Sequence, residues 1–271
     1  MFFKVEKFED IHAIQVSKTV LNKPLYFVHA FCIDNLLIDT GFDGSKTYMQ
    51  QFIKDYRVKS IVITHHHEDH IGANAAANRL GITPIVPAEG IELIRHPHAL
   101  QWYRRLLWGL PEPSEAGLLP DKVRTRRFNL DVIPTPGHSH DHTVFYEKSR
   151  GWLFSGDVFL AEKLKYMRDD EDANITIETL RKLLGLDFDV MFDALRGPVH
   201  DAKTAIKNKL TFLEEKKALV QSLHKKGLGL RSITTRAFGR EDFMTMLSGG
   251  HFSKINFTKS LLGISKYPLS T

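Results

Sequence analysis

The chain has a single cysteine, Cys32, inside the apolar run "YFVHAFCID". An intrachain disulfide is therefore impossible, and any metal site must be built from histidine and carboxylate side chains, leaving Cys32 to pack in the core. No apolar stretch approaches the roughly 20 residues that are needed to cross a bilayer. Charges at Lys4, Glu6 and Lys7 interrupt the beginning of the chain. We therefore expect a cytoplasmic protein that has no membrane partner.

The sequence also has only a small excess of charge of one sign. Its 271 residues include 37 Lys and Arg against 32 Asp and Glu, giving a formal net charge of +5. A basic surface attracts nucleic acids, phosphate esters and carboxylates, although many ordinary globular surfaces carry the same balance. The length and the 42% hydrophobic content indicate one main core with an appendage.

Segments rich in β-branched and aromatic residues, typical of strands, alternate with helical patterns over the first 200 residues. The strand candidates include "IHAIQVS", "LYFVHAFCI", "NLLIDTG", "SIVIT", "HTVFYEK" and "WLFSGD". A helix is predicted over 44–56, where Tyr48, Phe52 and Tyr56 recur every four residues. Strands with interspersed helices predict a layered α/β domain.

A different pattern begins near Asp201, where apolar residues follow a helical period up to Gly227. This pattern predicts a long helix. Its apolar stripe consists of Ile206, Leu210, Leu213, Val220 and Leu223. Two short helices around a Ser-Gly-Gly-His turn follow, with Ser253 as the expected cap of the second.

The block "THHHEDH", residues 64–70, places four histidines and two acids directly after a predicted strand. Alternate side chains of an extended chain point to the same side, so His65, His67 and Asp69 project together while His66 and Glu68 point elsewhere. His70 follows at once. Imidazoles and carboxylates are the usual zinc ligands where thiolates are absent. The block therefore predicts a metal site rather than a solvated polar turn.

Three further polar residues also lie where predicted strands end. His138 follows a Pro-Gly turn in "PTPGHSHDH", Asp157 closes "WLFSGD", and Asp39 closes "LLIDTG". The small residues beside them, such as Gly137 and Gly156, allow the backbone to approach a metal closely. We expect these residues to join the histidine block in one site.

Taken in this order, the motifs resemble those of the metallo-β-lactamase superfamily, whose His-x-His-x-Asp-His pattern is matched by the block at 65–70. The resemblance covers roughly residues 10–200. It implies a four-layer αββα sandwich that holds two divalent metal ions, with zinc expected and manganese or iron as alternatives. It further implies that His65, His67 and His138 bind one ion, that Asp69 and His70 bind a second, and that Asp157 bridges both.

The resemblance also assigns supporting and catalytic roles. Asp69 would orient a metal-bound hydroxide and handle its proton, which makes it the expected catalytic residue. Asp39 would orient the metal ligands without binding metal itself, and His142, at the end of "GHSHDH", would support the same ligands from behind.

One departure from the superfamily pattern concerns its last metal-binding histidine. The corresponding segment reads "DVMFDALRGPVHDA", where Leu195 or Arg196 occupies the expected position. His200 could swing back to replace the histidine, or Asp193 or a water could substitute for it. We therefore expect a modified second metal site.

The expected organisation is a catalytic domain over 1–204, with a cap-like insertion at about 90–122, followed by a helical extension over 205–271. In the insertion, Arg104 and Trp108 share a helix face that could hold an anionic or planar substrate, unless the helix simply covers the core. The extension is expected to pack against the core or against a second copy in a homodimer. Residues there that would suit RNA phosphates are Arg231, Arg236, Arg240 and Lys254.

These features predict a binuclear metal-dependent hydrolase that cleaves an ester, thioester or phosphodiester bond. The expected substrate is a small molecule that could be anionic. Two alternatives stay open. One is an iron-dependent oxidoreductase of the same superfamily. The other is an RNA-binding protein or ribonuclease with a modified second metal site.

Overall fold

The computed structural model describes residues 1–264; residues 265–271 of the predicted extension lie outside the described part. The chain divides into two compact units, each assembled from separate stretches. The first unit contains Met1–Pro134, Asp141–Leu160 and Phe188–His200, and the second contains Thr135–His140, Ala161–Asp187 and the chain from Asp201 onward. The domain boundary after residue 204 stays a prediction.

A seven-stranded mixed sheet forms half of the first unit. Its strands, in spatial order, are β1 (Phe2–Phe8), β2 (Ile11–Ser17), β5 (Val28–Ile33), β6 (Leu36–Ile38), β7 (Ser60–Val62), β8 (Ile85–Val86) and β9 (Gly117–Leu118). Strands β1, β2, β5 and β6 pair antiparallel, and β6 to β9 pair parallel. A small hairpin of β3 (Thr19–Val20) and β4 (Lys23–Pro24) lies between β2 and β5 in the sequence.

The other half of the first unit is a six-stranded sheet. It contains β10 (Lys122–Arg124), β11 (Asn129–Pro134), β12 (Thr143–Glu147), β13 (Trp152–Gly156), β15 (Val190–Asp193) and β16 (Gly197–Val199). All neighbours pair antiparallel except β13 and β15, which run parallel. Because β13 and β15 are parallel, the residues that follow them emerge at the same edge of the sheet.

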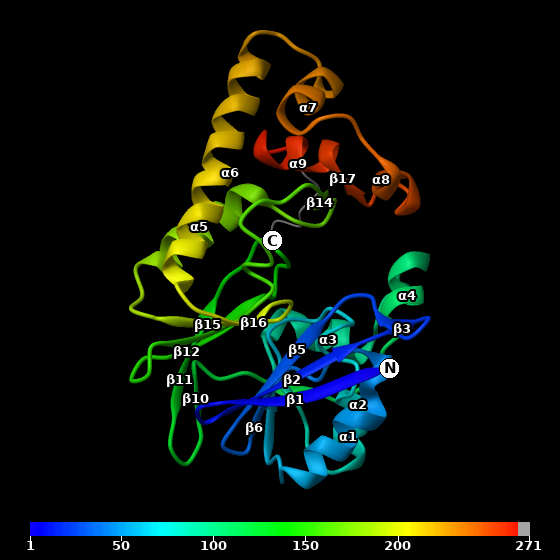
Figure 1. Cartoon of the computed structure of the whole chain (residues 1–271), viewed down its shortest axis with the longest axis vertical. Coiled ribbons are helices and arrows are strands. Elements are labelled where there is room, and N and C mark those ends of the chain that lie inside the picture. Colours follow the sequence, from blue (N-terminus) through cyan, green and yellow to red (C-terminus); the bar gives the residue numbers. More distant parts are fainter. Residues whose placement is uncertain (265–271) are drawn as a thin grey trace. The chain divides into compact units, whose positions relative to one another are not determined.

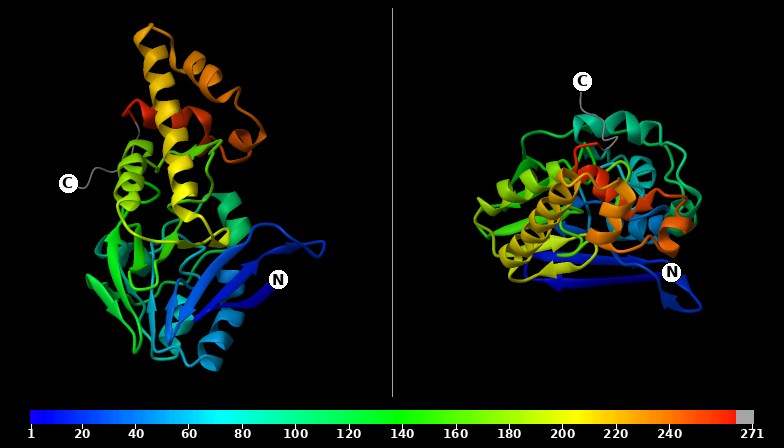
Figure 2. Two further views of the ribbon diagram at one scale, coloured as in Figure 1. Left: turned by 60° about the vertical axis from the view of Figure 1, so that its left-hand side comes forward. Right: turned by 90° about the horizontal axis from the view of Figure 1, so that it is seen from above.

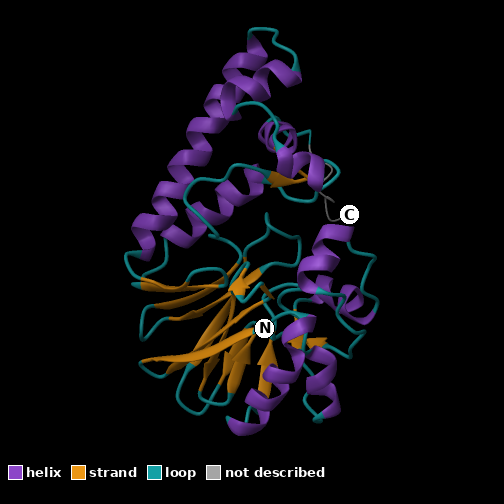
Figure 3. Ribbon diagram, turned by 45° about the vertical axis from the view of Figure 1, so that its right-hand side comes forward, coloured by secondary structure: helices purple, strands orange, loops and turns teal. Residues whose placement is uncertain are grey.

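The two sheets face each other across a core of aromatic side chains. The ring of Phe31 on β5 lies 5.8 Å from Phe154 on β13 and 5.4 Å from Phe192 on β15. Strand β5 is buried along its whole length, which explains why its sequence reads as a nearly continuous apolar run. Cys32 lies in this strand, fully buried, as predicted. Figure 3 shows the two layers of strands.

Short helices cover the outer face of the seven-stranded sheet (Figure 1). They are η1 (Asp43–Ser45), α1 (Lys46–Asp55), α2 (Asn74–Arg79), η2 (Ala88–Gly90), α3 (Ile91–Arg95) and α4 (Trp102–Trp108). The predicted stripe on α1 is wrong in part, because Met49, Phe52 and Ile53 are its buried residues. Tyr48 and Tyr56 are 45% and 37% exposed.

The second unit is mainly helical. Its elements are β14 (Met167–Arg168), α5 (Ala173–Leu184), α6 (Ala202–Lys225), α7 (Leu230–Phe238), α8 (Phe243–Leu247), β17 (Phe252–Ser253) and α9 (Lys254–Leu261). Helix α6 packs along α5 and contacts α7 and α9 (Figure 2). The predicted long helix is confirmed, and all five residues of its apolar stripe are buried.

The end of the described chain follows the sequence prediction with one addition. Helices α8 and α9 flank the Ser-Gly-Gly-His turn, and the Ser253 hydroxyl accepts a hydrogen bond from the Asn256 N–H at 3.1 Å, as expected for a helix cap. Helix α7 is the additional element.

Lys254 does not suit the predicted contact with RNA phosphates. Its side chain is buried, its Nζ donates to the Arg240 carbonyl at 2.6 Å, and the same atom lies 3.3 Å from the Asp242 carboxylate. Across residues 1–264, no helix combines the length and apolar character that crossing a membrane requires.

Candidate metal centre

Asp39 and the histidine block meet where two parallel strands end. Asp39 follows β6 with a positive φ of 63°, and its Oδ1 accepts the Thr64 N–H beyond β7 at 2.8 Å. Its Oδ2 accepts a hydrogen bond from Nδ1 of His70 at 2.7 Å. Because Nδ1 of His70 is engaged in this way, its Nε2 is the ring nitrogen directed away from Asp39.

The side chains of the block converge as the alternation predicts. The ring of His65 lies 4.3 Å from that of His67 and 4.2 Å from that of His70. His65 and His70 are fully buried, and His67 and Asp69 are buried nearly as deeply. Histidines this densely packed and buried, with a carboxylate among them, form a donor set suited to a divalent cation.

Asp157, at the end of β13, joins this cluster from the other sheet. Its Oδ1 lies 3.3 Å from Nε2 of His70, and its backbone N–H donates to Nε2 of His142 at 3.0 Å. The His142 ring is also 4.9 Å from the His65 ring. His142 therefore contacts the turn that carries Asp157 from behind, and it lies against a histidine of the block.

The electrostatics of this cluster call for a cation. Burial opposes protonation of His70, but Asp39, Asp157 and Asp69 outweigh it and raise the pKa of the imidazole well above its usual value. Burial, together with Glu68 and Asp157, raises the pKa of Asp69 to about 6 despite the attraction of His70. Without metal, a protonated imidazole thus offsets the surrounding carboxylates, and its buried Nε2 makes no hydrogen bond. The residues present fit a divalent metal ion.

The two block residues expected to point elsewhere do so. The His66 N–H and Nδ1 each lie 2.8 Å from a carboxylate oxygen of Asp141. Glu68 is buried and accepts two hydrogen bonds from Arg104, at 2.7 Å from Nε and 2.6 Å from Nη2. Arg104 is therefore committed to Glu68 and does not present its charge to a substrate.

Trp108, on the same helix α4, packs against the core with its ring 5.3 Å from that of Phe42. These contacts favour a helix that covers the core over a helix face that holds substrate.

His138 belongs to the second unit, within Thr135–His140. Its Nδ1 lies 2.9 Å from Glu171 Oε1, and its carbonyl accepts a hydrogen bond from Arg168 Nη2 at 3.0 Å. Burial would raise the pKa of Glu171, but Arg168 and His138 outweigh it and lower the pKa to about 2. The sequence-based prediction did not include Glu171, since "MRDDEDAN" contains four acids in succession and nothing in it distinguishes the one that contacts His138.

The segment that lacks the last superfamily histidine is also resolved in detail. His200 is exposed, and its ring lies 5.6 Å from that of Phe8. Because Met191 pairs with Val199, His200 lies at the beginning of β15, whereas Asp193 ends that strand beside Gly156. His200 is therefore about 10 Å along the strand from the edge that carries the cluster.

Asp193 is buried at that edge and is held by backbone groups. Its Oδ1 accepts the N–H groups of Leu195 at 3.0 Å and Arg196 at 2.9 Å, and its Oδ2 accepts that of Leu160 at 3.3 Å. Burial and the nearby Asp157 raise the pKa of Asp193 to about 6, although these hydrogen bonds oppose the shift.

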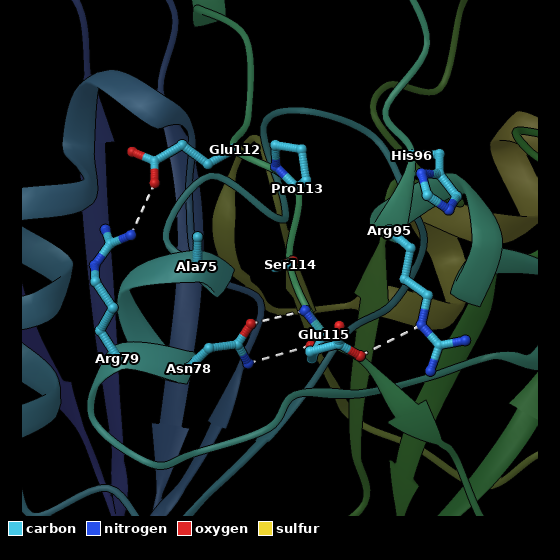
Figure 4. Close-up of a pocket in the computed structure, with 9 residues that line it drawn as sticks. All are labelled: Ala75, Asn78, Arg79, Arg95, His96, Glu112, Pro113, Ser114 and Glu115. Atoms are coloured by element: carbon cyan, nitrogen blue, oxygen red, sulfur yellow. Dashed lines mark hydrogen bonds and ion pairs between the residues drawn. The ribbon is translucent and has the colours of Figure 1, made fainter.

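A separate cleft of about 350 Å³ lies beside α2 and α3 (Figure 4). Its charged side chains are paired with one another: Arg79 donates to Glu112 at 2.8 Å, and Arg95 Nε lies 3.6 Å from Glu115. Asn78 also lines the cleft, and its side-chain oxygen accepts a hydrogen bond from the Glu115 N–H at 2.8 Å. With its charges offset, the cleft carries no visible preference for an anion or a cation.

Comparison with known proteins now gives the family. A model of the metallo-β-lactamase superfamily matches residues 27–192, more than half of the chain. The chain belongs to the metallo-β-lactamase superfamily. Its predicted fold, an α/β sandwich with helices at the C-terminal side, is confirmed.

Solved structures of this superfamily share the fold over most of the chain. A metallo-β-lactamase family protein of Thermus thermophilus has a TM-score of 0.66 at 19% identity, covering 94% of this chain and 91% of its own. A β-lactamase domain protein of Burkholderia ambifaria has a TM-score of 0.66 at 15% identity, covering 96% and 87%.

Curated relatives match in sequence over shorter stretches. A hydroxyacylglutathione hydrolase of Aeromonas hydrophila is 31% identical over 129 residues, which is 46% of this chain and 42% of that protein. The lactamase-like protein aptB of Emericella nidulans is 25% identical over 218 residues, 75% of this chain and 64% of that protein. The chain thus spans less than two thirds of the length of each of these relatives.

Proposed function

We propose that the protein is a metal-dependent hydrolase that cleaves thioesters or related acyl esters of small molecules. The observation that carries this proposal is the convergence of buried histidine and carboxylate donors at the ends of β7 and β13, where Nε2 of His70 lies 3.3 Å from Asp157 and 3.9 Å from Asp69. Such an arrangement is costly without a cation and has no role in packing the core. Its purpose is therefore to hold metal.

The ligands proposed for the metal ions come from the residues of the cluster and from His138. His65, His67 and His138 would hold one ion, Asp69 and His70 would hold a second, and Asp157 would contact both. When bound, the metal supplies Lewis acidity that polarises the scissile carbonyl and lowers the pKa of water towards neutrality. Zinc suits this nitrogen and oxygen donor set, as manganese or iron also would.

The chain's own residues contribute orientation and proton transfer. Asp39 fixes the ring of His70 through Nδ1, so Nε2 is presented to the metal. Asp69 is buried beside His70, and its carboxylate is proposed to accept the proton of the attacking water.

The choice of acyl substrates is supported by relatives. Among the similar curated proteins, several carry the name hydroxyacylglutathione hydrolase, which denotes cleavage of an acyl-glutathione. The phosphodiester alternative has weaker support, because Lys254, one of the four residues proposed to contact RNA, is engaged within the chain.

Metal analysis combined with a thioesterase assay tests the proposal. Purified protein dialysed free of loosely held ions is expected to retain zinc or manganese and to hydrolyse a hydroxyacyl-glutathione thioester. Asp157→Asn should lower both the metal content and kcat/KM, the latter by roughly 100-fold or more. His96→Ala, whose side chain is 80% exposed on another surface, serves as the control and should change neither.

Thioester hydrolysis that persists after complete removal of metal would refute the proposal. Bound iron together with visible absorbance and no hydrolysis would instead favour the oxidoreductase alternative.

A further inference from the structure

Arg196 lies in the segment after β15 in which the superfamily pattern leads us to expect a metal-binding histidine, and in which the sequence offers Leu195 or Arg196 instead. A guanidinium has no lone pair to offer a metal and stays protonated at any physiological pH. Arg196 therefore brings a permanent positive charge, and no metal ligand, to the segment that follows β15.

The backbone of Arg196 is fixed next to the turn that carries Asp157. Gly156 pairs with Asp193 across β13 and β15, and the Arg196 N–H donates to the Asp193 carboxylate at 2.9 Å. The N–H of Leu160 donates to the other oxygen of the same carboxylate at 3.3 Å. One buried aspartate thus ties together the two segments that leave the edge of the sheet.

The side chain of Arg196 is held on the same segment. Its Nε donates to the Leu160 carbonyl at 2.9 Å, and its guanidinium carbon lies 5.8 Å from the centre of the Phe159 ring. These contacts fix the plane of an otherwise exposed group. Within residues 1–264, the Nη1 and Nη2 groups of Arg196 form no ion pair. Arg104, by contrast, forms an ion pair with Glu68.

Two oriented NH₂ groups on one guanidinium match the two oxygens of a carboxylate or phosphate. We propose that Arg196 binds an anionic group of the substrate, so the natural substrate is an acyl thioester or ester that carries a carboxylate or a phosphate. This inference rests on the proposed hydrolase function and narrows its substrate class.

Matched pairs of thioesters test the role of Arg196. In one pair the carboxylate is on the acyl part, with succinyl and butyryl thioesters of the same neutral thiol. In the other it is on the thiol part, with acetyl thioesters of 3-mercaptopropionate and of its amide. The wild-type protein should prefer the charged member of at least one pair. Arg196→Ala should lower kcat/KM for that member by roughly 10- to 100-fold, mainly through KM, and leave the neutral member within about twofold.

Two further variants separate charge from geometry and from fold. Arg196→Lys keeps the charge but loses the paired donors, and an intermediate preference is expected. Arg127→Ala removes another exposed arginine that lies over a phenylalanine ring, 5.0 Å from the centre of Phe128, and should leave both preferences unchanged. The proposal is overturned if Arg196→Ala alters the preference in neither pair.

Calorimetry with succinate keeps the test independent of turnover. The metal-loaded wild-type protein should bind succinate more tightly than Arg196→Ala by a similar factor, and Arg127→Ala should match the wild type. If no thioester is hydrolysed but this difference is found, the hydrolase proposal fails while the anion site stands. Equal binding by the wild type and Arg196→Ala, or no binding by either, overturns the anion site itself.

Discussion

At the scale of single residues, Glu171 is expected to control how firmly His138 binds metal. A carboxylate on Nδ1 fixes the tautomer and the ring orientation, and losing such a partner typically weakens metal binding by about 10- to 100-fold. Glu171→Gln should therefore lower zinc affinity by that factor in a competition assay with a chromophoric chelator. Glu171→Asp should recover part of it.

The control is Glu178→Gln, which removes an exposed carboxylate that pairs with Arg181 at 2.6 Å on α5. Equal zinc affinities for Glu171→Gln and this control would contradict the assigned role. Glu171 also illustrates a limit of sequence reasoning. Strand ends reveal His65, His138 and Asp157 because period and turn residues locate them, but no local pattern brings position 171 to position 138.

The pH dependence of the metal-free protein follows from the same cluster. The pKa of His70 is raised well above its usual value, and the pKa values of Asp69 and Asp193 are raised to about 6. In each case the folded state holds its proton more tightly than the unfolded chain, so stability falls as pH rises through these values.

We expect the metal-free protein to lose on the order of 1–3 kcal/mol of unfolding free energy between pH 5 and pH 8. Metal should flatten this dependence, because the cation replaces the protons that offset the carboxylates. Thermal unfolding of both forms at several pH values measures the effect. A metal-free protein that becomes more stable towards pH 8 would contradict the predicted protonation of the cluster.

At the scale of elements, alternation along the chain after β7 correctly separates the side chains of His65 and His67 from those of His66 and Glu68. The helical period on α1 was less reliable. Its aromatic repeat at Tyr48 and Tyr56 predicts the wrong face, because tyrosines tolerate partial exposure and the core selects Met49 and Ile53 one position away. Periodicity locates an element better than it orients one whose aromatic residues are amphipathic.

Helix α4 is anchored by the buried pair of Arg104 and Glu68. Removing one member leaves an uncompensated buried charge, which typically costs about 3–5 kcal/mol, whereas removing both costs much less. Arg104→Met should lower the unfolding free energy in urea by that amount, and combining it with Glu68→Leu should restore most of it.

An exposed ion pair provides the comparison. Arg79→Met breaks a pair with Glu112 in which both side chains are 40% exposed or more, and should cost about 1 kcal/mol or less. If Arg104→Met costs no more than Arg79→Met, then the pair of Arg104 and Glu68 does not behave as buried.

At the scale of the whole molecule, the chain passes between the two units five times, at residues 134/135, 140/141, 160/161, 187/188 and 200/201. Along the sequence, stretches that belong to one unit therefore lie between stretches that belong to the other. A linear reading of the sequence, which predicts domains as successive stretches, has no signal for such interleaving. We expect interleaved units to unfold in one cooperative transition, because neither can lose its structure without releasing the ends of the other.

Two optical signals can test this cooperativity because they report on different units. All three tryptophans, Trp102, Trp108 and Trp152, lie in the first unit, whereas the longest helices, α6 with 24 residues and α5 with 12, lie in the second. Tryptophan fluorescence thus follows the first unit, and far-ultraviolet circular dichroism is weighted towards the second. Coincident thermal transitions are expected for the wild-type protein.

Phe257→Ala sharpens the test, because Phe257 is fully buried in the second unit with its ring 4.6 Å from that of Phe238. Its loss should cost about 3–5 kcal/mol, lowering the midpoint by roughly 10 °C. The fluorescence midpoint should fall together with the dichroism midpoint, although every tryptophan lies in the other unit. Phe243→Ala, at a position that is 64% exposed, should move neither. A fluorescence transition that stays in place while the dichroism transition moves would mean that the units unfold separately, despite the five crossings that join them.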